Sequence, residues 1–386
     1  MATVRFGDVA ERVNTKEDRL NTDLVYYVGG EHIESNALTV SGRGKIKEAD
    51  LGPMFYFGFK PGDILFVTRN PHLRKCATVD FSGICSEKTL VIGTKDEDVL
   101  SQKYLATVMQ SDDFWEFMEE NKSGSVNYFI NWSTLANYEF DLPPIERQRE
   151  LANLLWAAND LKESYKKAIT ATDEMLKAKF REMFGNTKDS KGDIVIGTVC
   201  IGEITELVTK GTTPTSIGFQ FEDEGVNFLK AENITDDGRF VRETMMHISD
   251  GCNDKLRRSQ LRAGDYLFSI AGVIGRTAIV DESILPCNTN QAIAIIRLKN
   301  LPELDRAFFG ALLRSEFVLK QCELQQKQTA QANISLEDVR NIAVPLPPLS
   351  LQREFVAIAE RADAAKSALK QSIADIDQVM KGLING

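Results

Sequence analysis

The side chains of this sequence that could do chemistry are hydrogen-bonding groups in loops, and the chemistry they suit is recognition. Arg can donate two hydrogen bonds to guanine, and Asn or Gln can pair with adenine in the same bidentate way. In residues 1–143 the candidate contacts are Arg43, Lys45, Arg69, Asn70, His72, Arg74, Lys75, Lys122, Ser125 and Asn127. In residues 187–345 they are Lys210, Thr212, Thr213, Lys230, Asn233, Arg276, Gln328, Gln331 and Asn333. For each residue, the simpler alternative is a solvated loop side chain.

The segment Arg69–Lys75 concentrates positive charge, because four of its seven side chains are basic or imidazole. Arg257 and Arg258, beside Lys255, form a second basic group, which is either a phosphate contact or a surface turn. The sequence therefore predicts local basic patches.

Motifs for the common catalytic and cofactor-binding chemistries are missing. The sequence has no Gly-x-x-x-x-Gly-Lys-Ser/Thr loop, no Gly-x-Gly-x-x-Gly after a strand, and no Asn/Asp-Pro-Pro-aromatic tetrad to hold a flipped adenine. The acidic pairs Asp112-Asp113 and Asp236-Asp237 suit a helix or turn surface better than a metal-dependent nuclease. The six Cys and three His are scattered without ligand spacing. We expect no catalytic residue, no metal site and no cofactor.

Composition sets the class of protein. A chain of 386 residues with 43% hydrophobic and 26% charged residues has room for two or three globular domains. The net charge of −10 argues against a large nucleic-acid footprint, unless a partner supplies the phosphate contacts. No apolar run has the length of a membrane span, and the N-terminal residues lack the apolar core of a signal peptide. We expect a cytoplasmic protein.

Two near-copies of one stretch organise the elements that carry these loops. Leu142–Glu150 reads Leu-Pro-Pro-Ile-Glu-Arg-Gln-Arg-Glu, and Leu346–Glu354 reads Leu-Pro-Pro-Leu-Ser-Leu-Gln-Arg-Glu. The copies lie 346 − 142 = 204 residues apart. A long run with apolar residues near every 3.5 positions follows each copy, which predicts helices over about 145–184 and 350–383 with a coiled-coil seam. The chain is predicted to run module, helix, module, helix.

The modules themselves show signs of duplication. Gly62-Asp63 matches Gly264-Asp265 at an offset of 264 − 62 = 202. Three further matches are proposed at the same offset: Cys85 with Cys287, Asn131 with Asn333, and Ser133 with Ser335. The side chains between them differ widely. Two modules with one scaffold and different loops suggest two different ligands of the same kind.

These residues resemble the specificity (S) subunit of type I restriction–modification systems, over essentially the whole chain. The matching features are the duplicated Pro-Pro…Gln-Arg-Glu helix start, the Gly-Asp-hydrophobic strand in each half, and Gly211-Thr212-Thr213-Pro214. Gly124–Asn127 before Asn131-Trp132-Ser133, and Thr329–Ser335, add to them. The first half departs from the pattern, since Glu11–Thr15 stand in place of the Gly-x-Thr-Pro loop, and Phe129 stands at the register of Gln331.

The resemblance implies an α+β fold with a pseudo-twofold internal repeat. Two similar α/β target recognition domains (1–143 and 187–345) would be separated by two spacer helices (144–186 and 346–386) that form an antiparallel coiled coil. Each domain would recognise one half of a bipartite site in double-stranded DNA. The helices would set the half-site spacing and dock two modification (methyltransferase) subunits, and restriction subunits would join for cleavage.

Physical dimensions agree with this expectation. A helix of 35–40 residues is roughly 50–60 Å long, and B-DNA advances about 34 Å per turn. Two alternatives stay open. The acidic net charge favours a coiled-coil adaptor with two protein-binding modules and no direct DNA role. An enzyme with an unrecognised site is the other.

Overall fold

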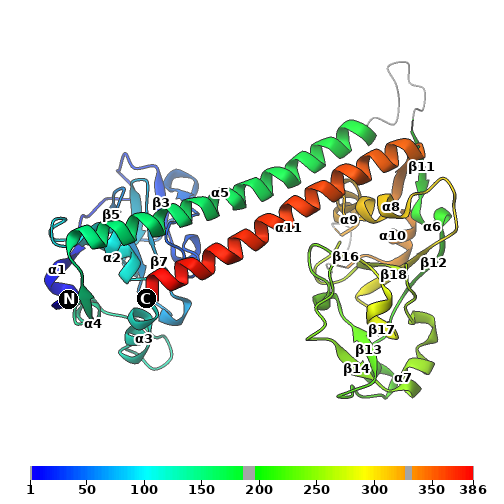
Figure 1. Ribbon diagram of the computed structural model, residues 1–386, viewed down its shortest axis with the longest axis horizontal. Coiled ribbons are helices and arrows are strands. Elements are labelled where there is room, and N and C mark those ends of the chain that lie inside the picture. The colour runs from blue at the N-terminus through cyan, green and yellow to red at the C-terminus, as the bar shows by residue number, and fades with distance from the viewer. Residues whose placement is uncertain (1, 186–195, 327–332, 386) are drawn as a thin grey trace. The chain divides into compact units, whose positions relative to one another are not determined.

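The computed structural model describes residues 2–185, 196–326 and 333–385. The chain forms two compact units (Figure 1). Unit 1 combines Met1–Ala168 with Ala368–Gly386, and unit 2 is Ile169–Ser367. Each long helix, α5 (Ile145–Phe184) or α11 (Leu349–Asn385), therefore contributes one part to each unit. Among the described helices, none combines the length and apolar character that crossing a membrane requires.

Unit 1 is built on two four-stranded sheets, in the orders β2-β9-β6-β7 and β4-β3-β8-β5. A separate antiparallel pair of β1 and β10 brings the start of the module beside its end. The strands are β1 (Ala2–Arg5), β2 (Ala10–Val13), β3 (Tyr26–Val28), β4 (Gly44–Lys45), β5 (Phe55–Phe59), β6 (Ile64–Val67), β7 (Cys76–Thr78), β8 (Gly83–Ser86), β9 (Thr89–Thr94) and β10 (Glu139–Leu142). The helices before α5 are α1 (Phe6–Val9), α2 (Gln102–Val108), α3 (Asp112–Glu120) and α4 (Trp132–Ala136).

Strand β6 is apolar on both faces because it separates two cores. Ile64 and Phe66 face the core shared with α2 and α3, where Phe66 stacks on Trp115 at 5.5 Å between ring centroids. Leu65 points to the opposite face, into the core under the second sheet. The alternation follows from the two-residue period of a strand. A continuous apolar run after Gly62-Asp63 is thus the sequence of a strand buried on both sides.

Unit 2 repeats this architecture. Its sheets have the orders β12-β18-β15-β16 and β14-β13-β17, and β11 pairs antiparallel with β19. The strands are β11 (Gly197–Cys200), β12 (Thr205–Lys210), β13 (Val226–Leu229), β14 (Met246–Ile248), β15 (Tyr266–Ser269), β16 (Thr277–Ile279), β17 (Cys287–Thr289), β18 (Ile293–Leu298) and β19 (Ala343–Leu346). The helices are α6 (Ile201–Ile204), α7 (Asp250–Lys255), α8 (Arg306–Leu313), α9 (Glu316–Gln326) and α10 (Leu336–Asn341).

Strand β5 of unit 1 has no counterpart in unit 2. Unit 1 has strand β5 between β4 and β6, whereas unit 2 has α7 and a 3₁₀ turn, Arg257–Ser259, between β14 and β15. The second sheet of unit 2 is consequently one strand narrower. The scaffold is duplicated, and the connections carry the differences.

The Gly-Asp landmark of the predicted repeat is confirmed. Gly62 (φ +94°) and Gly264 (φ +84°) both adopt the left-handed conformation that glycine tolerates best. The carboxylate after each glycine accepts a hydrogen bond at 2.8 Å from a backbone N–H three residues earlier in the chain, that of Lys60 for Asp63 and that of Arg262 for Asp265. The motif is a turn that launches the central strand.

The other three landmarks at offset 202 are wrong in register. Cys85 pairs with Val28 at the end of β3, and the residue that pairs with Leu229 at the end of β13 is Thr289 rather than Cys287. The connection from β7 to β8 is residues 79–82, and that from β16 to β17 is residues 280–286. The connection from β15 to β16 (270–276) is one residue shorter than that from β6 to β7 (68–75), so the net insertion is 3 − 1 = 2 residues and the offset rises from 202 to 204.

Helix caps show the same shift. Asn131 is the N-cap residue of α4, and Ser335 is the N-cap residue of α10, so these two residues are equivalent at offset 204. The proposed pairs Asn131 with Asn333 and Ser133 with Ser335 are therefore coincidences of residue type. The duplication is real, but only the Gly-Asp turn lies at the predicted offset.

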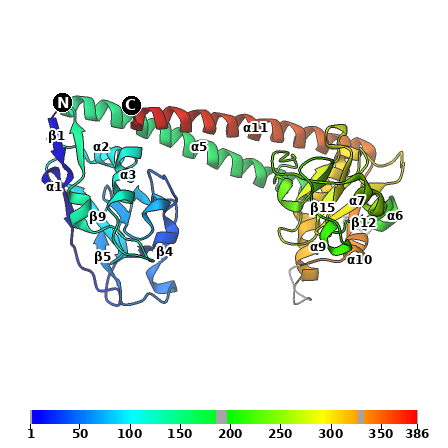
Figure 2. The ribbon, with the colours of Figure 1, turned by 90° about the horizontal axis from the view of Figure 1, so that it is seen from below.

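The two long helices begin and end within two residues of the predicted positions, and they run antiparallel in each unit (Figures 1 and 2). In unit 1, Lys162 on α5 pairs with Asp377 on α11, with 2.5 Å between Nζ and Oδ1. In unit 2, Lys366 on α11 pairs with Asp173 on α5 at 2.8 Å. Since 366 − 162 and 377 − 173 both equal 204, one interhelical ion pair is built twice.

A buried glutamine fixes each helix to its module. The Gln148 amide donates to the carbonyl oxygens of Val99 (2.9 Å) and Pro143 (2.8 Å), and its Oε1 accepts from the N–H of Ser101 (3.0 Å). The equivalent Gln352 is also fully buried. Gln352 donates to Glu303 and Pro347 at 2.7 Å and accepts from Asp305 at 2.8 Å. The glutamine of the duplicated Gln-Arg-Glu motif is therefore structural.

Replacing this glutamine should destabilise the unit that contains it. Gln148→Leu removes three buried hydrogen bonds at about 1 kcal/mol each, so the free energy of unfolding of unit 1 should fall by roughly 3 kcal/mol in urea titrations. Gln371→Leu is the matched control, because Gln371 is exposed and its amide donates only to Asp375. Equal losses in the two variants would contradict the structural role of Gln148.

Candidate nucleic-acid interface

Two of the predicted loops of unit 1 come together. Arg69 forms an isolated β-bridge with Phe129, and the N–H of Asn70 donates to the carbonyl oxygen of Tyr128 at 3.1 Å. The Arg69 guanidinium donates to the carbonyl oxygen of Asn127 at 3.3 Å and lies 5.1 Å from the centre of the Phe129 ring. The segments 69–75 and 122–129 thus form one surface, which we name the unit 1 loop pair.

The basic loop of this pair has an unusual backbone. Asn70 (φ 53°) and Arg74 (φ 48°) are both left-handed, on either side of the 3₁₀ turn Pro71–Leu73. A non-glycine residue in this region costs of order 1 kcal/mol and persists only where its surroundings hold it. The Arg74 guanidinium donates to Asp112 Oδ1 at 2.6 Å, and Lys75 Nζ donates to the carbonyl oxygen of Gly30 at 2.6 Å. These contacts fix the base of the loop and leave His72 exposed at its tip.

The other loop of the pair presents polar groups beside an aromatic ring. Lys122 Nζ lies 4.5 Å from the centre of the Tyr128 ring and pairs with Glu119 at 2.6 Å. Ser125 and Asn127 are exposed. Tyr128 belongs to the predicted segment 122–128, whereas Phe129, whose ring faces Arg69, was not among the predicted contacts. Basic residues with aromatic neighbours would have been the sequence signal for it.

Arg43 and Lys45 lie at the edge of the second sheet, and no described contact joins them to the loop pair. The Arg43 guanidinium sits 4.2 Å from the centre of the Tyr26 ring and 4.8 Å from that of Phe81. Lys45 is paired with Glu48 at 2.7 Å, and this hydrogen bond raises the lysine pKa. The structure thus separates the predicted residues of unit 1 into two groups.

In unit 2, the Gly-Thr-Thr-Pro segment after β12 is held rigidly. A Cβ on Gly211 would lie 1.7 Å from the carbonyl oxygen of Thr289, so only glycine fits there. The N–H groups of Gly211 and Thr212 donate to Asn290 and Thr289 at 3.1 and 3.2 Å. The Thr213 hydroxyl donates to Gln291 Oε1 at 2.6 Å. Lys210, just before this segment, has no side-chain partner within the described ranges.

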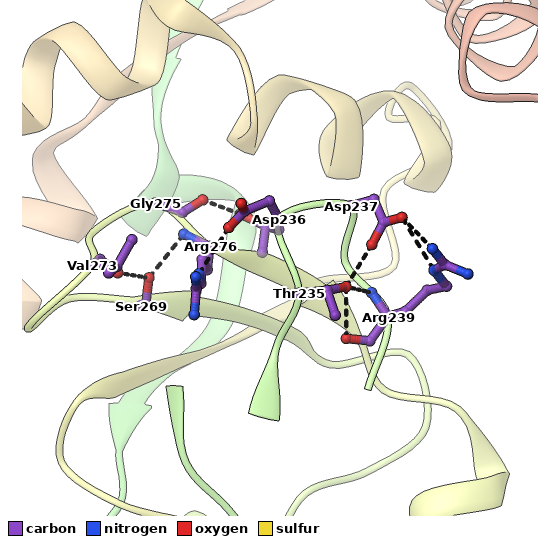
Figure 3. Close-up of polar contacts among 9 residues, drawn as sticks. Thr235, Asp236, Asp237, Arg239, Ser269, Val273, Gly275 and Arg276 are labelled. Atoms are coloured by element: carbon purple, nitrogen blue, oxygen red, sulfur yellow. Dashed lines mark hydrogen bonds and ion pairs between the residues drawn. The ribbon is translucent and has the colours of Figure 1, made fainter. Parts of the chain in front are cut away.

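Two other predicted cations of unit 2 are neutralised by carboxylates. Arg276 Nε pairs with Asp236 Oδ1 at 2.9 Å, and the Arg276 N–H donates to the Ser269 hydroxyl (Figure 3). Lys230 Nζ lies 3.7 Å from a Glu232 oxygen. Both cations would have to exchange these partners for a nucleic-acid group.

Asn233 is an internal capping residue. Its side chain is buried, its Oδ1 accepts from the N–H of Lys230 at 2.9 Å, and its amide donates to Thr244 at 2.9 Å. His32 caps the equivalent turn of unit 1, accepting from the N–H of Gly29 at 2.9 Å. We therefore leave Asn233 out of the interface. Asn333 is exposed, and Gln328 and Gln331 lie outside the described residues.

Two findings describe the metal-ligating and nucleophilic side chains of the described residues. Within the described ranges, no three His, Cys, Asp or Glu side chains are placed to hold a metal ion. Burial raises the pKa of Cys85 and Cys287 to about 12, so these thiols stay protonated and poorly nucleophilic.

Comparisons with known proteins find similarity to specificity subunits of type I restriction enzymes. Residues 196–378 match the family model for the type I restriction modification DNA specificity domain. The Type I restriction enzyme EcoBI specificity subunit of Escherichia coli is 27% identical over 166 residues, which are 42% of this chain and 34% of that protein. The MjaVIII specificity subunit of Methanocaldococcus jannaschii is 24% identical over 278 residues, 69% of this chain and 64% of that protein. The aligned region thus spans less than two thirds of both relatives.

Solved structures share the fold over nearly the whole chain. The S subunit of a type I restriction-modification system from M. genitalium has a TM-score of 0.59 at 14% identity, covering 99% of this chain and 94% of that one. A chain from a structure described as addressing complex assembly and conformational transition of the type I R-M system has a TM-score of 0.58 at 21% identity, covering 99% and 96%. These matches confirm the predicted fold class.

Asp112 gives a pH-dependent test of how the basic loop is held. The hydrogen bond from Arg74 is the main cause that lowers the pKa of Asp112, and Lys381 and Asn385 of α11 add to it. A carboxyl whose folded-state pKa is lowered stabilises the fold above its unfolded-state pKa, about 3.9, and loses this contribution as the pH falls through the folded-state value. We expect Asp112→Asn to reduce the stability of unit 1 at neutral pH, and the difference from wild type to shrink below about pH 4.

Urea unfolding followed between pH 3 and pH 7 measures this dependence, at steps of about one unit. Asp113→Asn is the control, because Asp113 shares the first turn of α3 but has no described hydrogen bond to Arg74. A difference between Asp112→Asn and wild type that stayed constant over the whole pH range would count against the ion pair.

Proposed function

We propose that this chain, which matches the family model for the type I restriction modification DNA specificity domain over residues 196–378, is the DNA sequence-recognition subunit of a type I restriction–modification complex and catalyses no step itself. Residues 1–143 and 187–345 act as target recognition domains, and residues 144–186 and 346–386 act as spacer helices. Each domain recognises one half of a bipartite site in double-stranded DNA. The protein works in the cytoplasm, where its DNA substrate is.

The observation that carries this proposal is one scaffold built twice with different loops. The strand orders β2-β9-β6-β7 and β12-β18-β15-β16 are equivalent, and so are the glutamine contacts at the start of each long helix. The loops on the two scaffolds differ in length and in side chains. A duplicated frame with variable connections suits two related ligands with different details, as two short DNA sequences are.

We propose that the spacer helices also bind two methyltransferase subunits, with restriction subunits joining that assembly. Met175 on α5 is 49% exposed, and its equivalent Val379 on α11 is 57% exposed, at the same offset of 204. Leu154 and Leu161, seven residues apart on α5, are exposed as well. Exposed apolar side chains in equivalent places support two similar docking sites.

A domain exchange tests whether each domain recognises one half of the bipartite site. Replacing residues 1–143 with the equivalent domain of a related subunit should change one half of the methylated sequence and leave the other half and the spacer unchanged. Methylation-sensitive sequencing of DNA from cells that express the chain with its methyltransferase subunits measures the outcome. Exchange of residues 187–345 is the reciprocal control. The proposal fails if either exchange alters both halves or neither.

Removal of a single base contact should change sequence specificity at fewer positions than a domain exchange does. If Arg69 of the unit 1 loop pair contacts a base, Arg69→Ala should relax specificity at one position of one half-site and weaken target binding by about 1–3 kcal/mol. Arg5→Ala is the control, because Arg5 is also an exposed arginine of unit 1 but is paired with Glu139 on β10. Binding to duplexes with every base substituted in turn measures the effect. Uniform weakening across all duplexes would assign Arg69 to the phosphate backbone instead.

A further inference from the structure

A basic hollow lies on unit 2. It has a volume of about 560 Å³, and seven residues line it: Thr212, Ile217, Phe219, Lys255, Leu256, Arg258 and Ser259. None of the seven is acidic. Lys255 and Arg258 come from the segment of α7 and the 3₁₀ turn that stands where unit 1 has strand β5. The segment that supplies the two cations is therefore specific to the second module.

The two cations that line the hollow are uncompensated. Neither the Lys255 side chain nor the Arg258 side chain has a hydrogen bond or ion pair to any residue that the structure describes, and both residues are exposed. Other cations of the same unit are paired, as Arg276 is with Asp236 and Arg297 is with Asp265. In a chain of net charge −10, two neighbouring unpaired cations at one depression are a local anion-attracting site.

The basic segment rests on a buried polar network. The Ser259 hydroxyl lies 2.7 Å from Asn288 Oδ1, and Asn288 Nδ2 donates to Asn253 Oδ1 at 2.8 Å and to the carbonyl oxygen of Leu256 at 3.2 Å. Ser259 and Asn288 are both buried. A fully paired buried network specifies one arrangement of the chain above it, so the backbone that carries Lys255 and Arg258 is preorganised.

Other lining residues supply a hydroxyl and an apolar surface. Thr212 belongs to the rigid Gly-Thr-Thr-Pro segment, and no hydrogen bond of its hydroxyl is described. Phe219 packs against the small core that includes Cys252 and Leu256. An ammonium, a guanidinium and a hydroxyl around one space suit a tetrahedral oxyanion, and the ring beside them suits a sugar face.

We infer that this hollow binds a phosphate of the DNA backbone and anchors the second module independently of sequence. The inference rests on the proposed function, and it assigns Lys255, Arg258 and Thr212 to phosphate contact rather than to base recognition. Because unit 1 lacks the element that carries the two cations, binding of the second half-site should depend more steeply on salt concentration than binding of the first.

The test uses the full chain assembled with its methyltransferase subunits, and the affinity for a target duplex is measured over a series of salt concentrations. Each of Lys255→Ala and Arg258→Ala should make the slope of log K against log salt concentration shallower by about 0.9. Target and non-target duplexes should lose affinity by the same factor. Arg257→Ala is the matched control, since it removes the same charge from the same segment but Arg257 does not line the hollow.

Methylphosphonate substitution identifies the phosphate. Making one backbone phosphate neutral at a time should weaken wild-type binding at a position in the second half-site, and the same substitution should have no further effect on the Arg258→Ala variant. Inorganic phosphate added as a competitor tests whether the hollow binds the phosphodiester of DNA or free phosphate. If it displaces DNA no better than sulfate at equal ionic strength, the site selects the phosphodiester of DNA, whereas selective displacement would identify a free-phosphate site and overturn the inference.

Two further results would contradict the inference that the hollow binds a backbone phosphate. If Lys255→Ala and Arg258→Ala bind with the wild-type salt slope, the hollow is not a DNA contact. If either variant changes the base preference at one position, the hollow recognises a base. Both results leave the proposed function intact, which fails only if the wild-type assembly shows no preference for a bipartite sequence. Unfolding curves that superimpose on wild type exclude a folding defect.

Discussion

The rest of the structure depends on one buried amide in each half. Gln148 and Gln352 each form hydrogen bonds with two carbonyl oxygens and one N–H. These bonds join the first turn of a long helix to the segment just before α2 in unit 1 and just before α8 in unit 2. A buried amide must satisfy all of its groups, so it holds only one relative position of the two elements. Apolar packing alone would allow the helix to rotate or slide on the module. The orientation of each set of loops is therefore tied to its helix.

Within that frame, the two units have diverged mainly where the frame does not constrain them. His32 and Asn233 cap the same turn with different chemistry, and both satisfy the same backbone N–H. The change from β5 to α7 replaces a sheet edge with a basic segment without disturbing the central strands. Positions that close the core keep their role, and surface connections are free to change length and charge. This is the pattern expected when selection acts on stability at some sites and on contacts at others.

The sequence could predict the parts of the fold that depend on short-range rules. The heptad spacing and the Leu-Pro-Pro starts located both long helices, and the Gly-Asp turn located the central strand of each module. The register of Cys85, Asn131 and Ser133 could not be found in this way, because a loop insertion shifts the numbering without leaving a mark in residue types. Strand pairing is non-local, and only the hydrogen-bonded partners identify equivalent residues.

The candidate interface was predicted less completely, for the same reason. Arg69 and Asn127 were each proposed, but their contact depends on tertiary structure that brings together residues 58 positions apart. Asn233 was proposed from its residue type, which does not indicate burial. Asp112 and Asp236 looked like surface acids, and the fold uses them as partners of Arg74 and Arg276. The identity of a polar residue shows what it can bind, and only the fold shows what it has already bound.

The composition of unit 1 has a consequence for how the chain is made. Unit 2 is continuous in sequence, whereas unit 1 needs Ala368–Gly386, which the ribosome adds only after all of unit 2. Until then, Leu155 lacks its cover from Met380, and Asp112 lacks its hydrogen bonds with Asn385. The module synthesised first is thus the module completed last. A nascent or shortened chain should present a finished second module beside an open first one, which is a state that quality control by chaperones and proteases can recognise.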